Sequence, residues 1–491
     1  MPFYAIFVCA PPTVRVPTNK KSLVSRLSSL VFFVSLQSVM SFKQKYLSKV
    51  GEILRLALPV VLAQLGYIAV QVADSAMVGM YGGEDAVPLA AVAFGSTIAW
   101  VFTFLCMGLS IGLTPIIGEL FVQGHKQKMA HYLETTLLFY PIFGVACMVL
   151  QIATEPLLYH LGQPVEVVDM ALPYYRLMAY CLPFAMFYGS FKQFLEGVGN
   201  TKSAMIVAII TNIINIALNY VFIFGKCGFE PMGVYGAGLS TLISRILNPL
   251  LLGGYFIYAK RYREYLSLFS RKAKHWKNSL HLLKMGLPIS GQMVLEALAF
   301  IVTGVMMGWF GTEAISANQV GNTYGNCTFM MVLSLGSATT ICVSHAFGRR
   351  DIDEICDVVR SSLAMAIVWG VCVIVTFVSL RHIMPMLFTQ NEAVIALASQ
   401  MLILYGTFQL SDAMQCILVG ILRGLQQVRS IAVISFVAYI VLNIPVGYFV
   451  AFRLGMGATG LIVGYIVGLS TAAILYGVQV ARYLRYLRKI S

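Results

Sequence analysis

The sequence contains twelve apolar segments, each long enough to cross a lipid bilayer as a helix. A membrane-spanning helix needs about 20 apolar residues, and backbone polar groups in hydrocarbon must pair within a helix or a closed barrel. The segments lack the alternating pattern of about ten residues that marks barrel strands. They cover residues 54–79, 88–115, 133–155, 170–195, 204–225, 234–259, 286–308, 315–345, 360–388, 396–421, 430–452 and 458–481. The sequence therefore predicts an all-α polytopic membrane protein.

Composition excludes the common soluble classes. Of the 491 residues 58% are hydrophobic and 11% are charged, whereas soluble domains carry about 25% charged residues. The ten cysteines are scattered without a CxxC pair, which argues against a disulfide scaffold or a structural zinc site. A phosphate-binding GxxxxGK[ST] loop and an HExxH motif are also absent from the sequence. We therefore expect neither an enzyme nor a resident cofactor.

The basic residues are distributed by topology. A net charge of +14 would suggest nucleic-acid binding in a soluble protein. Here Lys and Arg concentrate in alternate connections, and residues 260–284 alone carry eight of them against the single acid Glu264. Because Lys and Arg mark cytoplasmic loops, we expect both termini in the cytoplasm and the chain in the inner (cytoplasmic) cell membrane. This distribution explains the charge without a nucleic-acid partner.

The two halves of the chain repeat each other. Matched segments recur at an offset of 227–229 residues and preserve the register of Gly and Pro. The matched pairs are Leu58-Pro59 with Leu287-Pro288, Met77–Gly82 with Met306–Gly311, Gly197–Ser203 with Gly424–Ser430, and Asn215–Tyr220 with Asn443–Tyr448. Six spans per repeat is an even number, so the halves are parallel repeats about an axis along the membrane normal, with a cavity expected between them near the midplane.

This repeat gives the predicted domain organisation. Two six-helix bundles cover residues 51–259 and 285–485, joined by a cytoplasmic linker at 260–284 and followed by a basic tail at 486–491. Residues 1–50 form a basic extension with seven Lys and Arg residues and no acid. Two interpretations of the extension stay open: a disordered tail, or a stretch upstream of a true start at Met40.

Three acidic residues lie inside otherwise apolar spans: Asp74, Glu296 and Asp412. A charge at the centre of a membrane helix costs about 2.5–3.5 kcal/mol on insertion scales, so such residues usually face a cavity and mark an ion or proton pathway. None has a basic residue at the same depth in its own span. We expect these carboxyl groups to be protonated or to hold a cation.

Polar side chains share helix faces with these acids. Spacings of three, four and seven residues bring side chains to one face of a helix. The predicted cavity residues are Gln64, Gln71, Gln292, Gln319, Asn322, Asn326, Tyr405 and Gln415. An amide stripe at Asn212, Asn215 and Asn219 is equally consistent with hydrogen bonding between packed helices.

The pattern as a whole resembles the MATE (multidrug and toxic compound extrusion) transporters, over about residues 50–485. The segments that carry the resemblance are Gln71–Gly79 after Leu58-Pro59, Glu296 after Leu287-Pro288, and Ser411–Gln415 ahead of Leu422-Arg423-Gly424. The three acids together resemble the NorM-like branch. Lys192 departs from that branch, which often has Arg there, and residues 1–40 have no counterpart in it.

The resemblance implies a secondary antiporter that exports cationic amphipathic compounds in exchange for Na⁺ or H⁺. On that basis Glu296 and Asp412 would bind the coupling cation, Na⁺ if the protein is sodium-coupled, and Asp74 would take part in proton or substrate binding. The expected partners are the lipid bilayer and small cationic substrates, and we expect a monomer. The alternative is a lipid-linked oligosaccharide or lipid flippase of related architecture, which would need a cationic cavity.

Overall fold

The computed structural model describes residues 23–83, 85, 87–270 and 275–490, and this part of the chain is helical throughout, without a strand. In the first half the helices are α1 (Leu23–Gly82), α2 (Val87–Ile111), α3 (Leu113–Val122), α4 (Lys126–Ala153), α5 (Glu155–Leu158), α6 (Val165–Gly197), α7 (Thr201–Phe224), α8 (Gly233–Tyr258) and α9 (Lys260–Ser267). In the second half they are α10 (His275–Gly308), α11 (Thr312–Gly348), α12 (Ile352–Leu380), α13 (Ile383–Met386), α14 (Glu392–Gly424), α15 (Arg429–Ser435), η2 (Phe436–Asn443), α16 (Ile444–Tyr448), η3 (Phe449–Arg453) and α17 (Ala458–Ile490).

Twelve long helical runs result within the described ranges, because α2 continues into α3 and the segments from α15 to η3 form one run. Ten of them are long and apolar enough to cross a membrane, and the bent pair α8 and α9 adds an eleventh. The twelfth, α6, contains Arg176, Lys192 and Glu196. It packs against α2, α4 and α8, so much of its surface faces protein rather than lipid and requires less hydrophobicity.

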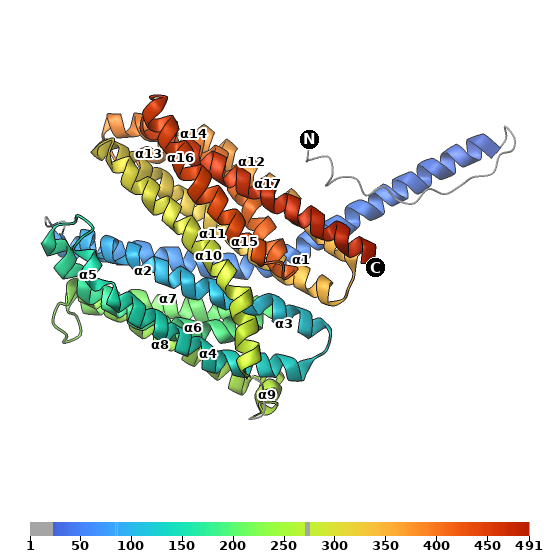
Figure 1. Ribbon diagram of the computed structural model, residues 1–491, viewed down its shortest axis with the longest axis horizontal. Coiled ribbons are helices and arrows are strands. Elements are labelled where there is room, and N and C mark those ends of the chain that lie inside the picture. Colours follow the sequence, from blue (N-terminus) through green and yellow to red (C-terminus); the bar gives the residue numbers. More distant parts are fainter. Residues whose placement is uncertain (1–22, 84, 86, 271–274, 491) are drawn as a thin grey trace.

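The helices form two bundles, which we name the N-lobe (α1–α8) and the C-lobe (α10–α17) (Figure 1). The same turns recur in both lobes. Positive φ values occur at Gly83 and Gly311, at Gly124 and Arg350, and at Gly199 and Gln426. Each pair is separated by about the repeat offset seen in the sequence, so the duplication extends to backbone conformation.

Two segments differ from the simplest sequence interpretation. The first helix begins at Leu23, so the described part of the basic extension belongs to a helix, and its start projects from the bundle (Figure 1). Residues 1–22 lie outside the described residues. The linker region contains the short helix α9 and the start of α10 at His275, so α10 begins before the apolar span predicted at 286–308.

The connections 123–125, 198–200, 349–351 and 425–428 and the end of α17 lie at one end of the bundle, which we name the basic face (Figure 1). The lobes touch there. His345 Nε2 lies 2.8 Å from the Gly197 carbonyl oxygen, and Gln426 Nε2 donates to Glu119 at 2.5 Å. Gly112 also approaches Gly286 closely, since a Cβ atom on Gly112 would lie 3.0 Å from the Gly286 Cα. The two lobes are therefore closed against each other at the basic face.

Candidate functional site: a cavity between the lobes

A cavity of about 690 Å³ lies between the lobes. The N-lobe contributes residues of α1 and α2, and the C-lobe contributes residues of α10, α11 and α14. Its aromatic lining includes Trp100, Phe104, Phe300, Phe329 and Phe408. Cavities of this size with a mainly apolar wall and a few polar groups are typical of sites for drug-sized ligands.

Two buried carboxyl groups lie at the C-lobe wall of the cavity. Glu296 on α10 is 8% exposed and Asp412 on α14 is 4% exposed. The side-chain nitrogen of Gln415 is 3.1 Å from Glu296 Oε1 and 3.1 Å from Asp412 Oδ1, so one amide group bridges both carboxyls. The two acids that the sequence places about 116 residues apart thus form one site.

A second layer of polar groups fixes this pair. Tyr439 on η2 donates its hydroxyl hydrogen to Gln415 Oε1 at 2.7 Å, which orients the amide so that its nitrogen faces the carboxyl groups. Gln292 donates to Glu296 Oε2 at 2.7 Å and accepts from Arg423 Nη2 at 2.7 Å. Each bridging amide therefore presents its nitrogen to an acid and its oxygen to a donor.

The sequence analysis did not assign Tyr439 or Arg423 to the site. Arg423, which follows the predicted tenth span, is 4% exposed and lines the cavity. Its guanidinium donates to Gln292, which in turn donates to Glu296. With both acids ionised, the three charged groups Glu296, Asp412 and Arg423 sum to one negative charge.

Most of the predicted cavity residues line this space. They are Gln71, Gln292, Gln319, Asn322, Asn326 and Tyr405, together with the two acids. The Tyr405 hydroxyl is 2.8 Å from Asn318 Oδ1 and 2.6 Å from Asn322 Oδ1, which ties α14 to α11. Gln415 contacts the acids from behind the lining.

Asp74 is separate from this cavity. It accepts a hydrogen bond from Asn219 on α7, and Asn219 in turn accepts one from Ser240 on α8 and donates to Asn215 at 3.1 Å. The amide of Asn219 therefore joins α7 to α1 and α8, whereas its bond to Asn215 stays within α7. The third acid forms a second polar centre inside the N-lobe, held by α1, α7 and α8.

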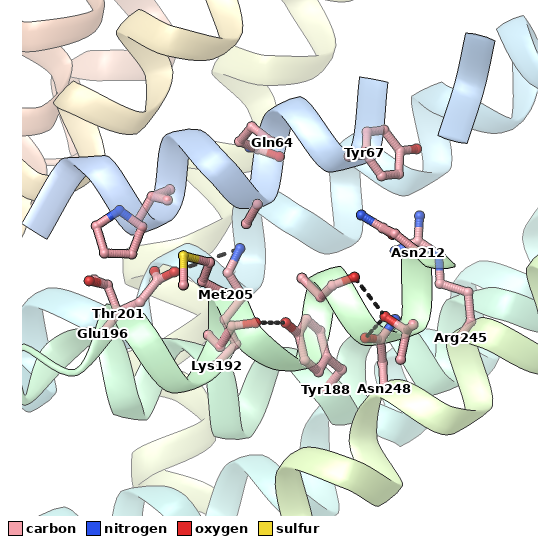
Figure 2. Close-up of a pocket in the computed structure, with 16 residues that line it drawn as sticks. Gln64, Tyr67, Tyr188, Lys192, Glu196, Thr201, Met205, Asn212, Arg245 and Asn248 are labelled. Atoms are coloured by element: carbon pink, nitrogen blue, oxygen red, sulfur yellow. Dashed lines mark hydrogen bonds and ion pairs between the residues drawn. The ribbon is translucent and has the colours of Figure 1, made fainter. Parts of the chain in front are cut away.

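Gln64 lies elsewhere again. It lines a smaller pocket between α1, α6, α7 and α8 that also contains Lys192, Glu196 and Arg245 (Figure 2). Lys192 Nζ is 3.7 Å from Glu196 Oε1, so these residues, four positions apart on α6, form an ion pair. Arg245 lies in the middle of α8, so the sequence interpretation that charges at bilayer depth are all acidic was wrong.

Together, the membrane-spanning helices, the duplicated lobes and the cavity between them define a polytopic transporter. The profile of the MatE family matches residues 59–221 and 288–449, which covers both lobes, and the chain belongs to this family. The profile includes α1 with Asp74, α10 with Glu296 and α14 with Asp412.

Individual proteins agree with this assignment. The chain is 28% identical over 450 residues to the multidrug resistance protein MdtK of Edwardsiella ictaluri (strain 93-146), covering 89% of this chain and 96% of that protein. Its fold is similar to that of the eukaryotic MATE transporter AtDTX14, with a TM-score of 0.81, 19% identity, and 91% and 99% of the two chains covered. A mutant of the Vibrio cholerae MATE transporter VcmN gives a TM-score of 0.81 at 18% identity, covering 90% of this chain and 98% of VcmN.

Proposed function

We propose that this protein is a secondary antiporter of the NorM-like branch that exports cationic, amphipathic compounds in exchange for Na⁺ or H⁺. The observation that carries the proposal is the bridged pair Glu296 and Asp412 at the wall of the cavity between the lobes. The similarity to a multidrug resistance protein supports the substrate class. Aromatic and carboxyl groups in one cavity suit a flat organic cation, because rings attract cations through their faces.

Export follows from competition for the carboxyl groups. When Na⁺ or H⁺ neutralises Glu296 and Asp412, the cavity loses its attraction for an organic cation, which leaves. Release of the coupling ion restores the negative charge and favours binding of the next substrate. A ligand shifts a conformational equilibrium only through different affinities for its states, and the change in buried charge supplies that difference.

With both acids ionised the cavity carries a net negative charge, which argues against the flippase alternative. A lipid-linked pyrophosphate would need a cationic site, and Arg423, the one cation at the acid pair among the described residues, is held by Gln292. We further propose that Asp74 takes part in proton or substrate binding from within the N-lobe. The basic face would lie in the cytoplasm, with both termini on that side of the inner membrane and the chain acting as a monomer.

The site is tested by efflux of ethidium from cells that carry Glu296→Gln or Asp412→Asn. Each substitution keeps the shape of the side chain and removes its charge, so we expect efflux to fall at least about tenfold, since a buried charged hydrogen bond contributes roughly 1.5–3 kcal/mol. Glu313→Gln, at an exposed acid at the start of α11, is the matched control and should export normally. Wild-type efflux by both cavity variants would contradict the proposed site.

The coupling ion is tested separately in proteoliposomes, with Na⁺ and pH gradients imposed one at a time. Uptake of a fluorescent cation under one gradient alone identifies that ion as the driving ion. The Asp412→Asn protein should lose the response to that gradient. Equal uptake without either gradient would contradict antiport and favour a passive channel.

A further inference from the structure

The smaller pocket of the N-lobe is lined by more positive than negative charge. It has a volume of about 110 Å³, several times the space that one water molecule requires. We name it the N-lobe pocket and define it by Gln64, Tyr67, Lys192, Glu196, Asn212 and Arg245. Lys192 and Arg245 contribute two positive charges and Glu196 one negative charge, so the pocket carries a net charge of +1.

The excess charge belongs to Arg245. Lys192 is held by Glu196, whereas the Arg245 guanidinium lies 5.5 Å from the centre of the Tyr67 ring. Within the described ranges no carboxylate oxygen comes within 4.0 Å of that guanidinium. Asp74 accepts a hydrogen bond from Asn219 and interacts with Arg245 only at a distance beyond 4.0 Å, without an ion pair. Arg245 is roughly 18–20 Å from both ends of α8 by the rise of a helix, a depth at which an unbalanced charge is costly.

Donor groups surround the same space. The side-chain amides of Gln64 and Asn212 form no hydrogen bond to other described residues, and Asn248 uses only its oxygen, which accepts from Thr211 at 2.9 Å. Figure 2 shows Gln64 and Tyr67 on α1 facing Lys192 on α6 and Arg245 and Asn248 on α8, with Asn212 on α7 between them. Amide nitrogens around a guanidinium are the arrangement that binds an oxyanion, since Arg offers several fixed donors to such groups.

We propose that the N-lobe pocket binds one small oxyanion, a phosphate or a similar group, on Arg245. The route of entry runs from the basic face, because Lys192 is about five residues from the end of α6 there and is 31% exposed. The anion would neutralise Arg245 and join α8 to α1 and α6. This site is distinct from the cavity between the lobes and does not depend on the transport function proposed above.

The test is the thermal stability of the purified full-length protein in detergent, with sodium phosphate titrated against sodium chloride at matched ionic strength. A ligand that binds the folded state raises Tm in a saturable way. We expect such a rise for the wild type and for Arg176→Gln, which removes an exposed N-lobe guanidinium paired with Glu155 outside the pocket. Arg245→Gln should weaken the apparent phosphate affinity at least about tenfold, and Arg245→Lys less.

A second variant covers the case in which Arg245→Gln does not fold. Ala208→Leu adds bulk to the pocket lining and keeps both cations, so it should abolish the phosphate effect by occupying the space. A third arm replaces phosphate with phosphatidylglycerol or phosphatidylcholine vesicles. If only phosphatidylglycerol raises Tm, and Arg245→Gln removes this rise, the oxyanion on Arg245 is the phosphate group of a lipid. If phosphate and phosphatidylglycerol do not raise Tm, or raise it equally in the wild type, Arg245→Gln and Ala208→Leu, the proposal is wrong.

Discussion

Gly199 adopts a φ of +79° in the turn between α6 and α7. A Cβ atom there would meet only the His345 ring at an ordinary 3.7 Å, so backbone conformation rather than space selects glycine. An L-residue in left-handed conformation costs about 1–2 kcal/mol. Gln426 already accepts this conformation in the C-lobe, with a φ of +58°, and its amide donates to Glu119 across the lobes.

We therefore expect Gly199→Ala to destabilise the protein by about 1 kcal/mol and to lower its apparent Tm in detergent. Gly254→Ala is the control: it lies inside α8, where no atom comes within 4 Å of an added Cβ, and alanine favours a helix over glycine by about 0.5–1 kcal/mol. An unchanged Tm for Gly199→Ala would show that the turn adopts another conformation.

Single residues also show what sequence alone could establish. Glu296, Asp412 and Asp74 were found because carboxyl groups are rare in apolar segments, and the same argument applied to Arg245 would have found the N-lobe pocket. The resemblance already gave Asp74 a role apart from the other two acids. Its separation from Gln64 and Gln71 could not be predicted, because helix periodicity places Gln64, Gln71 and Asp74 on one face of α1. The structure assigns them to three different surroundings, since α1 borders both lobes.

At the scale of elements, the run from α15 to η3 is the least regular helix of the C-lobe. Its two π-helical segments, η2 and η3, flank Pro445 in α16, and proline removes one backbone donor. π-Helical turns often occur at functional sites. Here η2 carries Tyr439, whose hydroxyl orients the amide between the two carboxyl groups.

We expect Tyr439→Phe to keep the fold and to reduce efflux roughly fivefold, the equivalent of one buried hydrogen bond of about 1 kcal/mol. Without the hydroxyl, Gln415 can turn its oxygen toward the acids, so the concentration of coupling ion needed for half-maximal efflux should also change. Tyr140→Phe is the matched control: it removes a buried hydroxyl that donates to the Leu109 carbonyl at 3.3 Å in the N-lobe, and Tyr140 does not line the cavity between the lobes. A Tyr439→Phe protein with normal efflux and ion dependence would contradict this positioning role.

Helical elements were predictable to different degrees. Apolar segments predicted twelve spans because lipid-facing residues dominate most windows, although α6 is mostly packed against protein and is less apolar. The helices also extend beyond the apolar stretches, and α10 begins at His275. The first turn of α4, Lys126–Met129, is polar, so hydropathy could not predict that the helix begins there. The π-helical segments were also invisible to it, because their residues are as apolar as those of any neighbouring span.

For the whole molecule, the decisive contact is the one between the lobes at the basic face. Small residues allow it: a Cβ on Gly118 of α3 would lie 3.0 Å from the Ser344 Cβ on α11. Further from this face, Ser290 Oγ of α10 donates to the Leu105 carbonyl of α2 at 2.7 Å. An exporter must admit substrate from the cytoplasm. If the basic face is cytoplasmic, these contacts have to separate in every transport cycle.

A disulfide between Gly118→Cys and Ser344→Cys should therefore stop transport. Disulfide-linked Cβ atoms lie about 3.5–4.5 Å apart, so the bond requires a shift of only about half an ångström. We expect an oxidant to abolish ethidium efflux in the double variant and a reductant to restore it. Each single variant is the control for oxidation of the nine other cysteines of the described residues. Suppose the fully cross-linked protein still exports ethidium at the rate of the reduced protein. The lobes then need not separate at the basic face, and a transport cycle that opens there is contradicted.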